Sequence, residues 1–196
     1  TQQVYVLGPR LLSMAHSVWG SFDVRGVASA EIEDLAAETG ETICLAQMDG
    51  LGIIVIDHRN NEAILGVRMQ VGHRDPAYCT AAGKILLAYQ TRERQADTAE
   101  RIRFTRYTDS TIVDAKALIA ELQLSRARGY ATSDQEQIPG VRSVAAPIFS
   151  RTGEAVASLF VTGPSVRLSM TRLHAVGRSL IKAAHRITGN LGGTAL

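Results

Sequence analysis

Apolar side chains recur at helical spacing in several stretches of the chain, and strand-like apolar runs lie between these stretches. The helical spacing predicts helices over residues 7–22, 23–40, 80–89, 110–129 and 171–189, with a more polar surface helix and loop over 92–103. The runs between them predict strands over residues 42–49, 51–58, 63–71, 130–136, 140–149 and 154–163. The strands therefore come in two consecutive sets, and helices follow each set.

Short polar or glycine signals mark where several of these elements begin and end. Asp23 and Asp114 are each suited to cap the helix that follows, and Gly40 and Gly129 are each suited to end one. The dipeptide Asp49-Gly50 between two apolar runs is a strong hairpin signal. Consecutive strands joined by hairpins pair side by side, so we expect a largely antiparallel sheet. Helices must cover this sheet, which predicts an α+β domain.

Length and composition narrow the class of protein. The 196 residues suffice for a domain with a sizeable core. The formal net charge is only +2 and no basic run is present, so the sequence predicts no nucleic-acid-binding face. We expect a cytoplasmic protein with reduced thiols and no membrane partner, because the two cysteines lack a disulfide spacing and no membrane-spanning or signal-peptide pattern is found. Since the chain begins at Thr1 without an initiator Met, we also expect a fragment of a longer protein.

The stretch "DPAYCTAAGK", residues 75–84, carries the first candidate site. Thr80 is suited to cap the following helix, with its hydroxyl accepting from the amide of Ala82 or Gly83. The amides of Ala81 and Ala82 then have no partner inside the helix, and the helix dipole makes this end positive. Such an end suits a carboxylate or a phosphate. The same small residues would also let the helix pack closely on the sheet, and both interpretations stay open at this point.

Cys79 is the candidate nucleophile of an alternative, enzymatic interpretation. A thiolate at a helix N-terminus would have a lowered pKa, but it needs a base, and only His73 is close in sequence. No Cys-His-Asx pattern is present, so a small buried residue is the simpler interpretation. Cys79 and His73 are also too few for a zinc site, which needs three or four ligands. We therefore expect no metal and no cofactor.

The strand predicted over residues 140–149 carries a second candidate site, which would form the wall of a ligand pocket. Val141, Ser143 and Ala145 share one face of that strand. If this face lines a pocket, Ser143 supplies a hydroxyl in an otherwise apolar wall, which suits recognition of a small polar ligand. In the alternative interpretation, Ser143 is an ordinary strand serine bonded to the backbone, and the nearby acids Asp134 and Glu136 are solvated.

Several phrases, in order and over nearly the whole chain, resemble the effector-binding domain of IclR-type transcriptional regulators. They are "YVLGPRLLSMA", "LAAETGETICLA", "VGHRDPAYCTAAGKILLA", "TIVDAKALIAELQLSRARGYA", "GVRSVAAPIFSRTGEAVASLFVTGP" and "RLS". The resemblance implies a GAF-like or profilin-like fold, with a curved, largely antiparallel sheet flanked by helices. It also implies a preceding winged helix-turn-helix domain, which would bind operator DNA in place of this chain. Residues 1–22 would then be the connecting helix, and residues 23–196 the effector-binding domain.

The resemblance also implies a ligand site. In family members that bind small acids, the acid lies against the helix-start amides, here Ala81 and Ala82, and against polar side chains of the last strands. Those polar positions are Ser133 and Ser143, with Asp134 taking over part of the polar role beside Ser133. The predicted ligand-binding residues are Thr80, Ala81, Ala82, Ser133, Asp134, Val141, Ser143, Ile64 and Val67, with Ile64, Val67 and Val141 as wall residues.

The ligand class follows from the same comparison. Some acid-binding members carry an acidic residue where this chain has Ser133, and this departure argues against a glyoxylate- or pyruvate-type ligand. The phrases "PAYCT" and "RSVA" look more like those of the branch that senses aromatic carboxylic acids and their degradation products.

Three functions are consistent with the sequence. The first is the ligand-sensing domain of a transcriptional regulator, which binds a small carboxylic-acid effector and acts as a homodimer or homotetramer. The second is a small thiol-dependent hydrolase that uses Cys79. The third is a ligand-free dimerisation module, whose partner surfaces would be the apolar faces around Trp19 and Leu180. The ordered family phrases favour the first, whereas the effector, the operator and the choice between repression and activation stay open.

Overall fold

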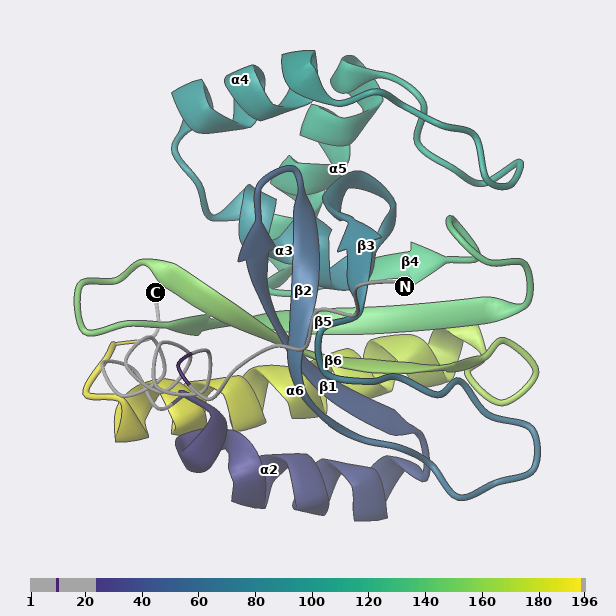
Figure 1. Cartoon of the computed structure of the whole chain (residues 1–196), viewed down its shortest axis with the longest axis vertical. Helices are drawn as coiled ribbons and strands as arrows, with labels where there is room; N and C mark the ends of the chain where they lie inside the picture. Colours follow the sequence, from purple (N-terminus) through teal and green to yellow (C-terminus); the bar gives the residue numbers. More distant parts are fainter. Residues whose placement is uncertain (1–9, 11–23, 195–196) are drawn as a thin grey trace, which may run out of the picture.

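The structure is a computed structural model that describes Arg10 and residues 24–194. In this part of the chain, six strands form one antiparallel sheet in the order β3-β2-β1-β6-β5-β4. The strands are β1 (Thr42–Asp49), β2 (Gly52–Arg59), β3 (Arg74–Pro76), β4 (Ala131–Asp134), β5 (Val141–Phe149) and β6 (Ala155–Pro164). The helices around the sheet are α2 (Val24–Thr39), the 3-10 helix η1 (Ala77–Cys79), α3 (Ala81–Ala88), α4 (Arg92–Arg101), α5 (Ala115–Arg128) and α6 (Met170–Asn190). The predicted α+β class is confirmed (Figure 1).

Tight turns set the pairing of neighbouring strands. β1 and β2 pair with Asp49 opposite Gly52, and Gly50 in the turn has a φ of +60°, a conformation that glycine adopts without strain. β5 and β6 are joined by a second turn, in which Gly153 has a φ of +79°. Both hairpins follow the sequence prediction, and the pairing of β1 with β6 joins them into one sheet.

The sheet is curled. The register of β1 against β2 shifts between Leu45 and Ala46, and a bulge of this kind bends a strand and increases its twist. In Figure 1, β2 runs across the direction of β5, which shows how strongly the sheet is curled.

The two faces of the sheet bury different layers. Alternate residues such as Ile43 and Leu45 on β1 pack with α2 and α6, which lie side by side under one face (Figure 1). Their neighbours Cys44 and Ala46 point the other way and pack with α3. The pattern repeats on β6, where Phe160 lies on the α3 side. Within residues 24–194, no helix is long and apolar enough to cross a membrane.

The helices on the second face are stacked outward from the sheet. α3 packs on the sheet, and α5 and α4 pack over it around Leu87, Leu118 and Leu122. The buried face of α5 includes Ser125 as well as the two leucines, as its spacing predicts. This arrangement leaves the beginning of α3 close to the ends of β4 and β5.

One predicted strand is wrong, and two other predictions fall outside the described residues. Residues 63–71 form no strand, because the side chain of Asn60 bonds both the amide (2.8 Å) and the carbonyl (2.9 Å) of Met69 and so closes a loop. The edge strand that pairs with β2 is instead β3. The helix over residues 7–22 and the cap at Asp23 lie, apart from Arg10, outside the described residues, and the division at residue 22 stays a prediction.

The cap of α5 gives a first testable prediction. The Oδ1 atom of Asp114 accepts a hydrogen bond from the amide of Ala117 at 2.8 Å. We expect Asp114→Ala to lower the free energy of unfolding by about 1 kcal/mol. The midpoint of thermal unfolding should then fall by about 2–4 °C. Circular dichroism during heating measures it, with Asp109→Ala on the exposed preceding loop as the control. Equal midpoints for the two variants would contradict a stabilising cap.

Candidate ligand-binding site

A cavity of about 70 Å³ lies between the beginning of α3 and the sheet. This is room for several water-sized groups, and hence for a small molecule. Six of the nine predicted site residues line it, namely Val67, Thr80, Ala82, Ser133, Val141 and Ser143. The remaining walls include Ile53 and Phe160 from β2 and β6, and Met69 and Ile138 from two loops. The cavity therefore brings together segments that are far apart in the sequence.

The chain before α3 creates one end of this cavity. Thr80 has extended backbone angles and caps the helix, with its hydroxyl oxygen accepting from the amide of Gly83 at 3.2 Å. The same hydroxyl donates to the carbonyl of Pro76 at 3.0 Å. Within the described part of the chain, the amides of Ala81 and Ala82 donate no hydrogen bond. Ala82 lines the cavity and lies in the first turn of α3, where the helix dipole favours an anionic or polar group.

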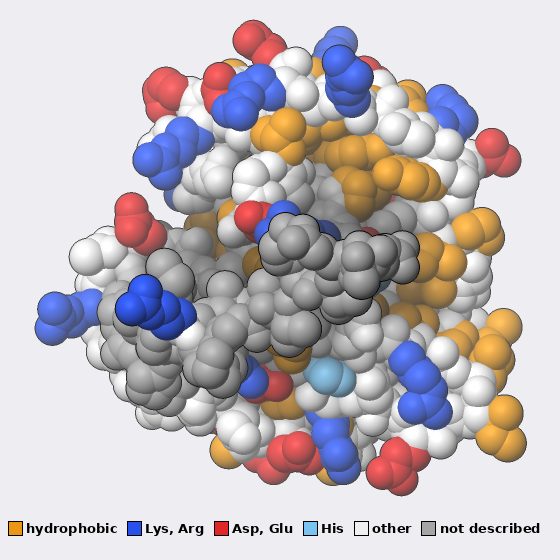
Figure 2. Space-filling view, viewed as in Figure 1, with side chains coloured by type: hydrophobic (Ala, Val, Ile, Leu, Met, Phe, Trp, Pro, Cys, Tyr) orange, Lys and Arg blue, Asp and Glu red, His pale blue; other side chains and the backbone are white. Residues whose placement is uncertain are grey.

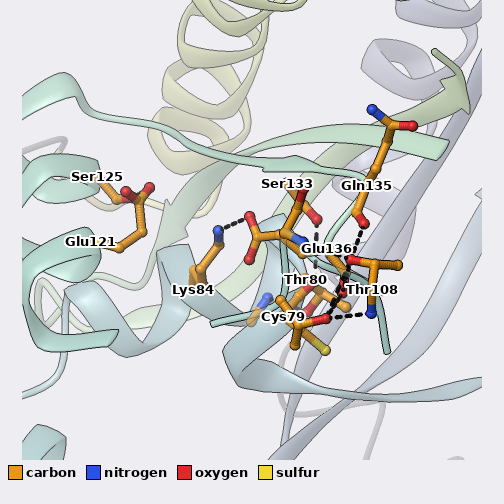
Figure 3. A network of polar contacts seen from close by, with 12 residues as sticks. Cys79, Thr80, Lys84, Thr108, Glu121, Ser125, Ser133, Gln135 and Glu136 are labelled. Carbon is orange, nitrogen blue, oxygen red and sulfur yellow. Dashed lines mark hydrogen bonds and ion pairs between the residues drawn. The ribbon is translucent and has the colours of Figure 1, made fainter. Parts of the chain in front are cut away.

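A row of hydroxyl side chains crosses three strands along the cavity wall. Ser133 on β4 lies opposite Ser143 on β5, which lies opposite Thr162 on β6, and all three line the cavity. Ser133 donates to the carbonyl of Cys79 at 3.1 Å (Figure 3), and Thr162 lies 3.5 Å from the carbonyl of Arg142. The hydroxyl of Ser143 has no hydrogen-bond partner among the described residues. Ser143 is therefore not bonded to the backbone as the alternative interpretation required.

Three further polar residues line the cavity that the sequence analysis did not assign to a ligand site. Asp75 on β3 accepts from the side-chain amide of Gln137 at 2.6 Å and lies 3.1 Å from Nε2 of His73. All three line the cavity. The sequence holds no local signal for this group, because Gln137 is 62 residues away from Asp75.

The other predicted site residues lie away from the cavity. Ile64 is fully exposed in the loop between β2 and β3, and Ala81 is buried in the core beside its neighbour Ala82. The carboxylate of Asp134 accepts from Arg142 at 2.6 Å, and this hydrogen bond lowers the pKa of Asp134. Because Asp134 follows Ser133 along a strand, its side chain points away from the face that Ser133 presents to the cavity.

A buried ion pair lies beside the cavity (Figure 3). The ammonium of Lys84 on α3 bonds the Glu136 carboxylate, and the Lys84 side chain is only 1% exposed. Burial raises the pKa of the Glu136 carboxyl, and the nearby Lys84 charge opposes this rise. Thr111 donates to the carbonyl of Glu136 at 2.6 Å, and Thr108 donates to that of Gln135 at 2.7 Å. The ion pair holds the loop between β4 and β5 against α3, and the two threonine contacts hold the same loop against the segment between α4 and α5.

For Lys84, the sequence itself indicates that a charged side chain is buried and needs a partner. Lys84 stands inside the apolar run "AAGKILLA", where a charged side chain is unusual and needs a partner. The partner, Glu136, is 52 residues away, and only the folded chain brings it close. The interpretation of Glu136 as a solvated acid is wrong, since the residue is buried.

The thiol of Cys79 is unsuited to nucleophilic chemistry. The residue is buried, and burial, with smaller contributions from the charges of Glu136 and Asp75, raises the pKa of its thiol to about 12. A thiol with that pKa is almost wholly protonated near neutral pH and is a poor nucleophile. The described residues also hold no group of three or more His, Cys, Asp or Glu side chains that could bind a metal ion.

Thiol reactivity gives a second prediction. We expect neither Cys79 nor Cys44 to be alkylated by iodoacetamide at about pH 8 on the time scale on which free glutathione reacts, because both are buried and their thiols have raised pKa values. Intact-mass spectrometry measures the reaction, and unfolding in urea should make both residues reactive. Rapid labelling of Cys79 in the folded chain would contradict this description of the thiol.

Comparison with known proteins places this geometry in a family. The family model described as the C-terminal region of the bacterial transcriptional regulator IclR matches residues 16–189. The HTH-type transcriptional regulator KdgR of Escherichia coli is 32% identical over 192 residues, which span 98% of this chain and 70% of KdgR. BhcR of Paracoccus denitrificans, another HTH-type transcriptional regulator, is 35% identical over 150 residues, spanning 76% of this chain and 54% of BhcR.

Solved structures agree with the sequence comparisons. The crystal structure of the C-terminal domain of E. coli KdgR superimposes with a TM-score of 0.79 at 32% identity, covering 87% of this chain and 99% of that domain. The crystal structure of Thermotoga maritima IclR superimposes with a TM-score of 0.85 at 28% identity, covering 96% of this chain and 76% of that protein. These relatives are transcriptional regulators and not enzymes. The chain therefore belongs to the IclR family of bacterial transcriptional regulators and corresponds to their C-terminal region.

Proposed function

We propose that this chain is the effector-sensing part of an IclR-family regulator, and that it binds a small carboxylic acid in the cavity at the beginning of α3. The observation that carries the proposal is that one small cavity is lined both by Ala82, whose amide donates no hydrogen bond, and by Ser143, whose hydroxyl has no partner among the described residues. A carboxylate held there would accept from the amide and from the hydroxyl of Ser143, since the hydroxyl of Ser133 already donates to the carbonyl of Cys79. The dipole of α3 would favour its negative charge.

DNA binding belongs to another part of the regulator in this proposal. On the face shown in Figure 2, Lys and Arg side chains are interspersed with Asp and Glu and do not gather in a basic patch. The acid would act by favouring one arrangement of subunits, in a homodimer or homotetramer, over another. Its effect on DNA affinity can be only as large as its difference in affinity for the two arrangements.

Thermal unfolding against a panel of small and aromatic monocarboxylates at millimolar concentration tests the proposal. An acid at about a hundred times its dissociation constant should add about 2.7 kcal/mol to the free energy of unfolding, which raises the midpoint by several degrees. We expect Ser143→Ala to reduce this shift, and the exposed control Ser110→Ala to preserve it. The absence of any shift across the panel would overturn the proposal and favour a ligand-free dimerisation module.

A further inference from the structure

The charges around the cavity are uneven. The described residues that line it include no lysine and no arginine, and their only carboxylate is that of Asp75. The Asp75 side chain is 13% exposed, so it is screened by water much less than a surface carboxylate. An anion in this cavity would be held by neutral donors and would also meet the negative charge of Asp75.

The carboxylate of Asp75 is fixed in position and can still accept further hydrogen bonds. Gln137 donates to its Oδ1 atom at 2.6 Å, and Nε2 of His73 lies 3.1 Å from its Oδ2 atom. Each carboxylate oxygen can accept two hydrogen bonds, so both oxygens retain one free position. The backbone of Asp75 is held as well, because β3 pairs with β2 and places Asp75 opposite Ile53. The cavity therefore has a preorganised hydrogen-bond acceptor in its wall.

The field of this carboxylate reaches into the cavity. Burial is the main reason that the pKa of the Cys79 thiol is raised, and the charges of Glu136 and then Asp75 add to the rise. The Glu136 charge is balanced by Lys84, whereas Asp75 has no lysine or arginine beside it among the residues that line the cavity. A ligand that carried negative charge at both ends would be repelled.

We propose that the effector is a short monocarboxylic acid that carries a second hydrogen-bond donor, either a hydroxyl or an ammonium group. Its carboxylate occupies the end formed by Ala82 and Ser143, and its donor group bonds Asp75. This inference rests on the proposed function, because it assigns the second end of the same cavity. It makes Asp75 a specificity-determining residue that selects substituted acids over plain monocarboxylates, dicarboxylates and phosphate.

Calorimetric titration of the intact chain with matched probes tests the inference. The probes are butanoate, succinate, the 2-, 3- and 4-hydroxybutanoates and the corresponding aminobutanoates. The aromatic pair is benzoate and 4-hydroxybenzoate. We expect at least one substituted acid to bind about tenfold more tightly than its plain counterpart, the worth of one hydrogen bond to a charged group. We expect succinate to bind more weakly than butanoate. Whether the hydroxy or the amino series binds identifies the donor.

Asp75→Asn removes the charge while it keeps the size and an acceptor oxygen. We expect this variant to lose most of the preference for the substituted acid and to bind the plain acid more tightly. Asp97→Asn, on the exposed side of α4, is the matched control and should leave both affinities unchanged. The comparison of plain and substituted acids in the wild type needs no variant. It therefore tests the proposed preference even if Asp75→Asn is unstable.

The outcomes separate the two proposals. Equal affinities for plain and substituted acids in the wild type, or an unchanged preference in Asp75→Asn, would overturn the role of Asp75 while leaving a carboxylate site in place. Binding of succinate more tightly than butanoate would overturn it too. If no acid of either kind binds, the proposed function itself fails, and this inference fails with it.

Discussion

Replacing Lys84 with methionine is expected to lower the free energy of unfolding by about 3–5 kcal/mol at about pH 8, because it leaves the Glu136 carboxylate buried without its counter-charge. The corresponding fall in unfolding midpoint is about 10 °C or more. The double variant Lys84→Met/Glu136→Met removes both charges and should recover most of the loss, since an apolar pair of similar volume replaces the ion pair. Thermal unfolding of the two variants and the wild type measures the effect.

The pH dependence of this variant has a definite sign. Burial already raises the pKa of Glu136, and loss of the Lys84 charge removes the interaction that opposes the rise. The folded variant therefore takes up a proton at higher pH than the unfolded chain does. The loss of stability should be full above that raised pKa and should shrink as pH falls towards about 5.

An exposed ion pair provides the control for Lys84→Met. Arg101 and Asp97 pair across one turn of α4 at 3.2 Å, and both side chains are 65% exposed. Arg101→Met should change the free energy of unfolding by no more than about 0.5 kcal/mol. If Lys84→Met unfolds at the same temperature as this control, the buried pair does not stabilise the contact between α3 and the β4–β5 loop.

A second large effect is expected at Gly83. A Cβ atom at this position would overlap the backbone of Ala77, which cannot move aside as the end of a flexible side chain could. We expect Gly83→Ala to lower the free energy of unfolding by about 3 kcal/mol or more, since α3 must shift away from η1. Urea denaturation followed by circular dichroism measures the change.

Gly189 is the matched control on another helix. A Cβ there would meet no atom within 4 Å, and alanine is a better helix former than glycine. Gly189→Ala should therefore leave the stability unchanged or raise it by about 0.5 kcal/mol. If both variants lose a similar amount of stability, the close approach of α3 to Ala77 is not the reason that position 83 requires glycine.

The sequence predicts those parts of the fold that depend on local chemistry. Thr80 and Asp114 cap their helices, and Gly129 ends α5 with a φ of +77°, because these structures need only residues a few positions apart. The turn at Asp49-Gly50 is local in the same sense. The curled sheet was expected from the family resemblance, and the order of hairpins alone indicates only that it is antiparallel.

The errors arise where contacts between distant segments decide the structure. Residues 63–71 have the apolar content of a strand, but Asn60 bonds Met69 and the edge of β2 is occupied by β3. The family resemblance implied that Ile64 lines the site, but its side chain is fully exposed in this loop. Neither the Asp75 and Gln137 contact nor the partner of Lys84 has a spacing rule, so no single-sequence pattern could have indicated them.

The hydroxyl row on β4, β5 and β6 has a consequence for how such a protein can change over evolution. Ser133, Ser143 and Thr162 project from the face of the sheet opposite the core that α2 and α6 cover. Their backbones hold the strands together, whereas their side chains contribute little to that core. In the ligand site that we propose, substitutions at these three positions would therefore alter chemical selectivity while the scaffold keeps its stability. The same sheet could be recruited to new metabolites by a few point mutations.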